Sequence, residues 1–110
     1  MNSELTFPIA GRAKVGKRTK DLTKRVEPGD IVVIDHEDID RVAAEALVDR
    51  QPGAVVNASA SISGRYPNAG PQILVEAGIP VLDVLDQDLF GVVHEGRFVE
   101  IDESGISLST

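Results

Sequence analysis

Residues 28–34 read Pro28-Gly29-Asp30-Ile31-Val32-Val33-Ile34. The Pro-Gly-Asp tripeptide is a turn signal, and four consecutive β-branched residues follow it. A short run of β-branched residues that begins at a turn is typical of a strand buried on both faces of a sheet. We therefore predict a buried strand over residues 31–34.

A helix and a second buried strand are predicted to follow. Asp38 is placed to cap the helix, and apolar residues then recur with the spacing of one helix face at Ile39, Val42, Ala43, Ala46 and Leu47. The turn at residues 51–53 ends the helix, and Ala54-Val55-Val56 has the composition of another buried strand. Two buried strands joined by a helix favour a parallel β-α-β unit.

Short elements are predicted for the rest of the chain. A polar loop leads to Pro71, which can start a helix over residues 72–77, and Gly78 ends that helix. A strand is expected over residues 79–82, a helical turn over 86–90 and a short strand over 91–94. Polar and apolar residues alternate over 97–101 and 106–108, which predicts half-buried antiparallel strands joined by a turn.

Length and composition fit a single domain of 110 residues, with 42% hydrophobic and 26% charged residues. The absence of cysteine from the sequence excludes a disulfide framework, a thiolate metal site and a cysteine nucleophile. No apolar run approaches the roughly 20 residues of a membrane span, and the first residues do not resemble a signal peptide. We expect a cytoplasmic protein. Because the chain ends directly after its last predicted strand, we interpret it as a piece of a longer protein.

Charge divides the chain in two. Residues 1–26 carry a net charge of +5, from seven basic residues against Glu4 and Asp21, and the remainder carries −12. We interpret residues 1–26 as a basic leader with a first helix, and residues 27–110 as one α/β domain. No aromatic residue is interleaved with the basic residues for base stacking, so we expect them to be solvated or paired with the acidic body, and we expect no nucleic-acid partner.

The polar loop after the second strand is the candidate binding site. It runs from a strand toward a helix N-terminus, where free backbone N–H groups favour an anion. Seven of its residues supply suitable donors and acceptors, namely Asn57, Ser59, Ser61, Ser63, Gly64, Arg65 and Asn68. The same residue types also crowd into loops merely to form turns and caps, and the sequence leaves the two interpretations open.

Catalytic and metal motifs are weak. His36 lies in Asp35-His36-Glu37-Asp38, which we interpret as a solvated helix start rather than a cation site. Asp83, Asp86 and Asp88 are likewise interpreted as caps and surface residues. The sequence contains no phosphate-binding loop, dinucleotide fingerprint or nucleophile elbow. We therefore predict no catalytic residue, no metal and no cofactor for this chain.

Five segments together resemble a known family, namely residues 25–35, 44–48, 55–58, 61–68 and 70–71. They are similar to the N-terminal region of the actinobacterial SteA proteins, and Ser-Gly-Arg-Tyr-Pro-Asn at 63–68 is the most specific piece. The resemblance implies a cytokinetic-ring protein linked to cell division, whose later portion is similar to thiamine pyrophosphokinase. It further implies a membrane partner of the SteB type and a full-length protein associated with the membrane at the division site.

The order of the predicted elements also resembles the swivelling phosphohistidine domain of phosphoenolpyruvate-utilising enzymes. That resemblance implies a three-layer α/β domain of the swivelling β/β/α type, and a small doubly wound sheet is the alternative. In the phosphohistidine family a histidine in the loop before the second helix accepts phosphate. The matching residues 63–71 contain no histidine, and a guanidinium such as that of Arg65 presents no free lone pair for the transfer.

Three functional hypotheses follow. The favoured one is a non-catalytic regulatory or interaction domain, whose partners are other domains of the full-length protein, a membrane division partner or a second copy of the chain. The second is a domain that senses a phosphorylated metabolite or nucleotide at the polar loop. The third is a phosphoryl-transfer domain, for which His36 is the one nucleophile beside a loop.

Overall fold

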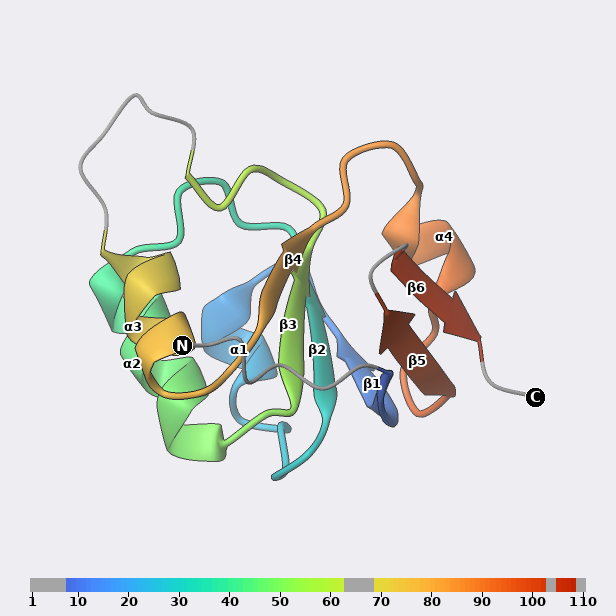
Figure 1. Cartoon of the computed structure of the whole chain (residues 1–110), viewed down its shortest axis with the longest axis horizontal. Helices are drawn as coiled ribbons and strands as arrows, with labels where there is room; N and C mark the ends of the chain where they lie inside the picture. Colours follow the sequence, from blue (N-terminus) through green and yellow to red (C-terminus); the bar gives the residue numbers. More distant parts are fainter. Residues whose placement is uncertain (1–7, 63–68, 103–104, 109–110) are drawn as a thin grey trace.

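A computed structural model describes residues 8–62, 69–102 and 105–108. These residues form one curled sheet and four helices, so the predicted α/β class is confirmed (Figure 1). In spatial order the strands are β4 (Val81–Asp83), β3 (Ala54–Asn57), β2 (Ile31–Ile34), β1 (Ile9–Val15), β5 (Phe98–Asp102) and β6 (Gly105–Leu108). The helices are α1 (Thr19–Leu22), α2 (Arg41–Arg50), α3 (Gly70–Glu76) and α4 (Leu89–Val92).

Strand β1 joins the parallel part of the sheet to the antiparallel part. It runs parallel to β2, with Ala13 opposite Ile31, and antiparallel to β5, with Arg12 opposite Phe98. Strands β2, β3 and β4 continue the parallel part, and the β2–β3 pairing is the parallel pair that the sequence predicts. The segment expected to be a basic leader thus contains a central strand of the sheet.

The β-branched run in β2 is buried on both faces, as predicted. Val32 and Ile34 point into a core beneath the helices, whereas Ile31 and Val33 point into a second core on the opposite face. All four side chains are fully buried. A strand at the centre of two cores needs apolar side chains at consecutive positions, which explains the absence of alternation in this run.

The two cores separate three layers. Helices α1, α2 and α3 contribute Leu22, Leu47 and Leu74 to the first core, so all three cover one face of the parallel strands. The second core contains Leu89 of α4 and Ile101 of β5, because the β5–β6 pair curls over the other face (Figure 1). The layers are therefore helices, parallel sheet and antiparallel ribbon, as the β/β/α interpretation expects.

The caps of α2 differ in detail from the prediction. Asp40, not Asp38, is the N-cap, and its Oδ1 accepts a hydrogen bond from the Ala43 backbone N–H at 2.8 Å. Asp38 instead has a positive φ of 54° in the turn before the helix. The C-terminal end is as predicted, because Gln51 takes the left-handed conformation that ends many helices.

Helix α3 starts one residue before Pro71, and its first residue packs closely against α2. A Cβ atom at Gly70 would collide with the Ile39 carbonyl oxygen and lie 2.8 Å from that of Asp40. The absence of a side chain at Gly70 therefore allows α3 to approach the start of α2.

The prediction of a short strand over residues 91–94 is wrong. Gly91 and Val92 belong to α4, whose N-cap Asp88 accepts hydrogen bonds from the Gly91 backbone N–H. The local apolar run favours a strand, but the cap and the burial of Leu89 in the second core stabilise a helical turn. In the described residues no helix is both long enough and apolar enough to cross a membrane.

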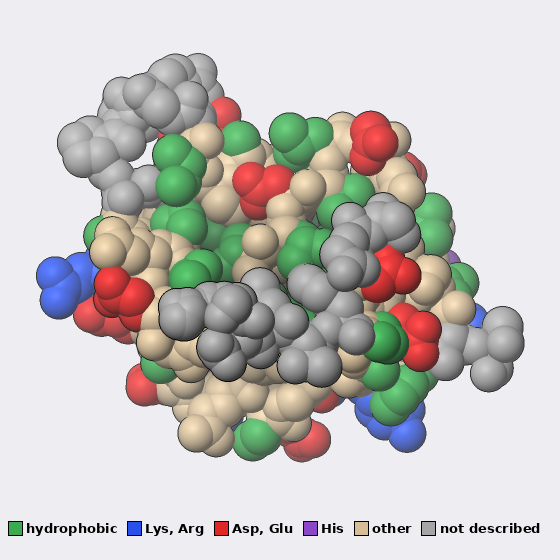
Figure 2. Space-filling model, in the orientation of Figure 1, with side chains coloured by type: hydrophobic (Ala, Val, Ile, Leu, Met, Phe, Trp, Pro, Cys, Tyr) green, Lys and Arg blue, Asp and Glu red, His purple; other side chains and the backbone are tan. Residues whose placement is uncertain are grey.

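Two basic residues of the N-terminal segment pair with the acidic body. Lys14 on β1 lies 3.0 Å from Asp30, and Arg25 makes two contacts of 2.9 and 3.1 Å with Glu95. Hydrogen bonding from Arg25 lowers the pKa of Glu95 below its ordinary value, and burial opposes this effect. Figure 2 shows a face on which Lys and Arg appear only at the margins.

Candidate functional site

The carboxyl ends of the parallel strands bring together residues that are distant in sequence. Because β1 to β4 are parallel, the segments that follow them lie at one edge of the sheet. These segments carry Lys17 after β1, His36 after β2 and Ser61 after β3. Open α/β sheets bind ligands preferentially at this edge.

Asn57, at the end of β3, organises this edge. Its side chain is fully buried and bonds both backbone groups of His36, accepting from the N–H at 3.0 Å and donating to the carbonyl at 2.9 Å. It also donates to the Ser61 hydroxyl at 2.9 Å. Asn57 therefore fixes the backbone of His36 and of the polar loop at the same time.

The described serines of the polar loop are bonded to carboxylates of neighbouring strand ends. Ser59 donates to Asp35 after β2. Ser61 donates through its backbone N–H at 2.9 Å and its hydroxyl at 2.5 Å to the two oxygens of Asp83 on β4. In this arrangement the described serines bridge three strand ends rather than facing an open site.

The remaining predicted loop residues, Ser63, Gly64, Arg65 and Asn68, lie outside the described residues. Anion binding by the polar loop therefore stays a prediction. The described part of the loop favours the structural interpretation, because each of Asn57, Ser59 and Ser61 has a protein partner.

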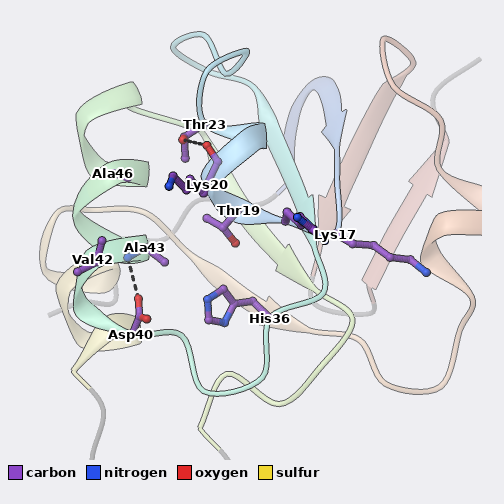
Figure 3. A pocket seen from close by; sticks show the side chains of 10 residues that line it. Lys17, Thr19, Lys20, Thr23, His36, Asp40, Val42, Ala43 and Ala46 are labelled. Carbon is purple, nitrogen blue, oxygen red and sulfur yellow. Dashed lines mark hydrogen bonds between the residues drawn. The ribbon is translucent and has the colours of Figure 1, made fainter.

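A hollow of about 520 Å³ lies beside this network, between α1 and α2 (Figure 3). We call it the α1–α2 hollow. It is lined by Lys17, Arg18, Thr19, Lys20, Thr23, His36, Asp40, Val42, Ala43 and Ala46. His36 connects the two features, because Asn57 holds its backbone while its half-buried ring faces the hollow.

The lining of the hollow is cationic on one side and apolar on the other. Lys17, Arg18 and Lys20 come from the segment around α1, whereas Val42, Ala43 and Ala46 come from α2. Lys17 extends away from the hollow, with its ammonium nitrogen 5.5 Å from the centre of the Phe90 ring. Among the described residues of the lining, Asp40 is the one carboxylate, and it caps α2.

Thr19 occupies an unusual position in the hollow. Thr19 is 4% exposed, and its hydroxyl oxygen is buried without a hydrogen-bond partner among the described residues. In Figure 3 this oxygen points toward the side of the hollow where His36 lies. Buried polar side chains usually have a partner, so this hydroxyl calls for an explanation.

Sequence reasoning did not identify this hollow. The basic residues around Thr19 were interpreted by charge alone, and His36 was interpreted as part of a solvated helix start. The hollow forms only when α1 packs beside α2, a contact between segments about twenty residues apart. In the described part of the chain, no cluster of three or more His, Asp or Glu side chains is placed to hold a metal ion.

No family model and no curated protein matches the chain. Solved structures do match its fold. Streptomyces coelicolor RraAS2, an unusual member of the RNase ES inhibitor RraA protein family, gives a TM-score of 0.60 at 14% identity, over 96% of this chain and 67% of that one. An S-adenosylmethionine:2-dimethylmenaquinone methyltransferase from Geobacillus kaustophilus gives a TM-score of 0.50 at 15% identity, over 92% of this chain and 76% of that one.

MccF, solved in complex with glutamyl sulfamoyl guanosine, gives a TM-score of 0.55 at 20% identity. The match covers 94% of this chain but only 38% of MccF, so the chain spans less than half the length of that protein. These likenesses show a shared fold.

The comparisons correct both family resemblances. The structural neighbours point neither to the SteA proteins nor to a phosphoenolpyruvate-utilising swivelling domain. The order of strands, helices and turns is a property of the architecture, which proteins with different functions share. The most specific shared piece, residues 63–68, lies outside the described residues. The expected cell-division role, the SteB-type partner and the kinase-like portion depended on that resemblance and have no other support.

Proposed function

We propose that this domain is a regulatory binding module that holds a small molecule in the α1–α2 hollow. The observation that carries the proposal is the hollow itself, whose volume of about 520 Å³ falls in the range of small-molecule sites. It lies at the carboxyl edge of the parallel strands, where ligands of α/β sheets commonly bind. The buried Asn57 holds the His36 backbone beside it.

The contacts in the hollow support binding rather than turnover. A hydroxyl nucleophile is activated by a hydrogen bond to a base. The Thr23 hydroxyl instead donates to the Lys20 carbonyl at 3.0 Å, and Nδ1 of His36 lies 3.2 Å from the Glu37 carbonyl. Within the described residues, neither hydroxyl of the hollow bonds to His36.

A regulatory role is compatible with this fold. One structural neighbour belongs to a family described as RNase ES inhibitors, which act on another protein. At 14% identity that likeness concerns the fold alone, and the proposal rests on the hollow.

The test is to fill the hollow. Ala46 lines it from α2, so Ala46→Phe places a ring in the space that a ligand would occupy. A mixed library of small carboxylates, phosphate esters and neutral aromatic compounds is screened by thermal shift and by amide chemical shifts. We expect hits that perturb the amides of α1 and of the first turn of α2, and we expect Ala46→Phe to abolish them.

Ala77→Phe is the matched control, because it adds the same ring at an exposed position at the end of α3. This variant should bind every hit as the unmodified chain does. Hits that bind Ala46→Phe with unchanged affinity, or a library that yields no hit at the hollow, would contradict the proposed function.

A further inference from the structure

The charged side chains that line the α1–α2 hollow are mainly cationic, whereas the chain as a whole has a negative net charge. The chain carries a formal net charge of −7, yet the described lining of the hollow has three cationic side chains against the single carboxylate of Asp40. Lys17 is turned toward Phe90, so Lys20 and Arg18 are the cations left for a bound molecule. A concave site with one sign of charge concentrates ligands of the opposite sign.

Thr19 supplies an independent indication of a ligand. The other buried polar side chains that the structure describes have partners. Thr23 bonds the Lys20 carbonyl, Asp30 pairs with Lys14, and Asn57 and Ser61 bond each other. The Thr19 hydroxyl is buried without a partner among the described residues, and it faces the hollow. A hydroxyl in this position can donate to an oxygen that enters the hollow.

The α2 side of the hollow is apolar. Val42, Ala43 and Ala46 lie on one face of α2, and Val42 is 77% exposed. A valine that is largely exposed beside two alanines leaves apolar surface next to the cationic side. A ligand that covers this surface gains the hydrophobic contribution of removing it from water.

We infer that the hollow binds an amphiphilic anion, in which one phosphate or carboxylate group is joined to a small apolar group. The anionic oxygens accept hydrogen bonds from the Thr19 hydroxyl and the Lys20 ammonium, next to the His36 ring. The apolar group lies on Val42, Ala43 and Ala46. This inference rests on the proposed function and names the class of ligand for the same site.

The experiment compares three probes of similar shape. Phenyl phosphate and benzoate each join an anion to a ring, whereas benzyl alcohol keeps the ring without the charge. Affinities are measured by amide chemical-shift titration at low and at high sodium chloride. We expect both anions to bind at least tenfold more tightly than benzyl alcohol, and we expect salt to weaken the anions alone.

Two variants of Thr19 test the hydrogen bond. Thr19→Val keeps the shape and removes the hydroxyl, so we expect anion affinity to fall about tenfold, in line with a hydrogen bond to a charged group. Thr19→Ser retains the hydroxyl and should retain most of the affinity. Lys20→Gln should also weaken the anions, whereas Lys24→Gln, an exposed lysine that does not line the hollow, should leave them unchanged.

The outcomes distinguish the inferred class of ligand from the proposed function. Benzyl alcohol binding the hollow as tightly as the anions, or Thr19→Val binding them with unchanged affinity, overturns the inferred ligand class and leaves the proposed function standing. Failure of all three probes together with failure of the broad library overturns the proposed function itself. The stronger of the two anions identifies phosphate or carboxylate as the headgroup.

Discussion

Asn57 bonds His36, Ser59 and Ser61 at the carboxyl edge of the sheet. We expect Asn57→Ala to lower the free energy of unfolding by about 3 kcal/mol, because it leaves buried or half-buried partners of several hydrogen bonds unsatisfied. Urea denaturation followed by far-ultraviolet circular dichroism measures the change.

Ser59→Ala is the control for this substitution, since Ser59 belongs to the same loop but makes its side-chain bond to an exposed carboxylate. We expect that variant to lose less than about 1 kcal/mol. Equal losses in the two variants would mean that Asn57 does not organise the edge.

The contacts of individual residues also explain why the candidate site could be predicted only in part. The polar loop was found because Ser, Asn and Gly are concentrated there, and that signal is local. The partners of Ser59 and Ser61 are Asp35 and Asp83, more than twenty residues away, and nothing in the loop itself indicates them. The Thr19 hydroxyl was missed for the same reason, because its burial depends on how α1 packs.

At the scale of elements, the contact between α2 and α3 depends on Gly70. We expect Gly70→Ala to destabilise the fold by about 2 kcal/mol, because the new Cβ would collide with the Ile39 carbonyl and push the helices apart. Thermal and urea unfolding measure the loss. Val75→Ala, on the exposed side of α3, should change stability by less than about 0.5 kcal/mol. If Gly70→Ala also changed the free energy of unfolding by less than about 0.5 kcal/mol, α3 would be able to shift freely.

The cluster of Arg25, Glu95 and Val15 ties the segment after α1, the turn before β5 and the end of β1 together. Arg25 bonds Glu95 and the Val15 carbonyl, and Glu95 accepts from the Val15 N–H at 3.1 Å. The pKa of Glu95 is lower in the folded chain than its ordinary value of 4.5, so folding favours the ionised carboxylate. The stabilisation from the ionised Glu95 carboxylate is complete above its pKa in the unfolded chain. This stabilisation is lost as pH falls through the lower pKa of the folded chain.

We therefore expect Glu95→Gln to flatten the fall in stability below about pH 4.5, and to lower stability slightly at pH 7. Urea unfolding at a series of pH values from 2 to 7 measures both effects. Glu100→Gln changes an exposed carboxylate of β5 and serves as the control. An identical pH profile in Glu95→Gln and the unmodified chain would refute the role of this pair.

Elements with a strong local pattern were predicted well, and β1 was not. Strands β2 and β3 were found because each is a run of apolar, mostly β-branched residues, and helix α2 was found because its apolar residues recur with helical spacing. In β1 the inward positions include Gly11 and Ala13, whose small side chains give little hydrophobic signal, and the basic residues Arg12 and Lys14 flank Ala13. Gly11 has to be small, because a Cβ there would collide with the Gly29 carbonyl.

At the scale of the whole molecule, one sheet separates two cores, and β2 supplies side chains to both. A strand shared in this way couples the cores, because neither can lose its packing without disturbing the other. We therefore expect the domain to unfold in a single cooperative transition. The strand order could not be predicted from the sequence, because pairing between β1 and β5 joins residues more than eighty positions apart.

Leu74→Ala removes packing from the core beneath the helices, and Ile101→Ala removes it from the core beneath the ribbon. Each should lower the free energy of unfolding by about 3 kcal/mol. Urea unfolding is followed by circular dichroism and by methyl signals from both cores, since the chain has no tryptophan. In each variant we expect the two sets of methyl signals to disappear at the same urea concentration. If Ile101→Ala shifted only the signals of its own core, the ribbon and the helical layer would be separate folding units, and the coupling through β2 would be weaker than the shared strand implies.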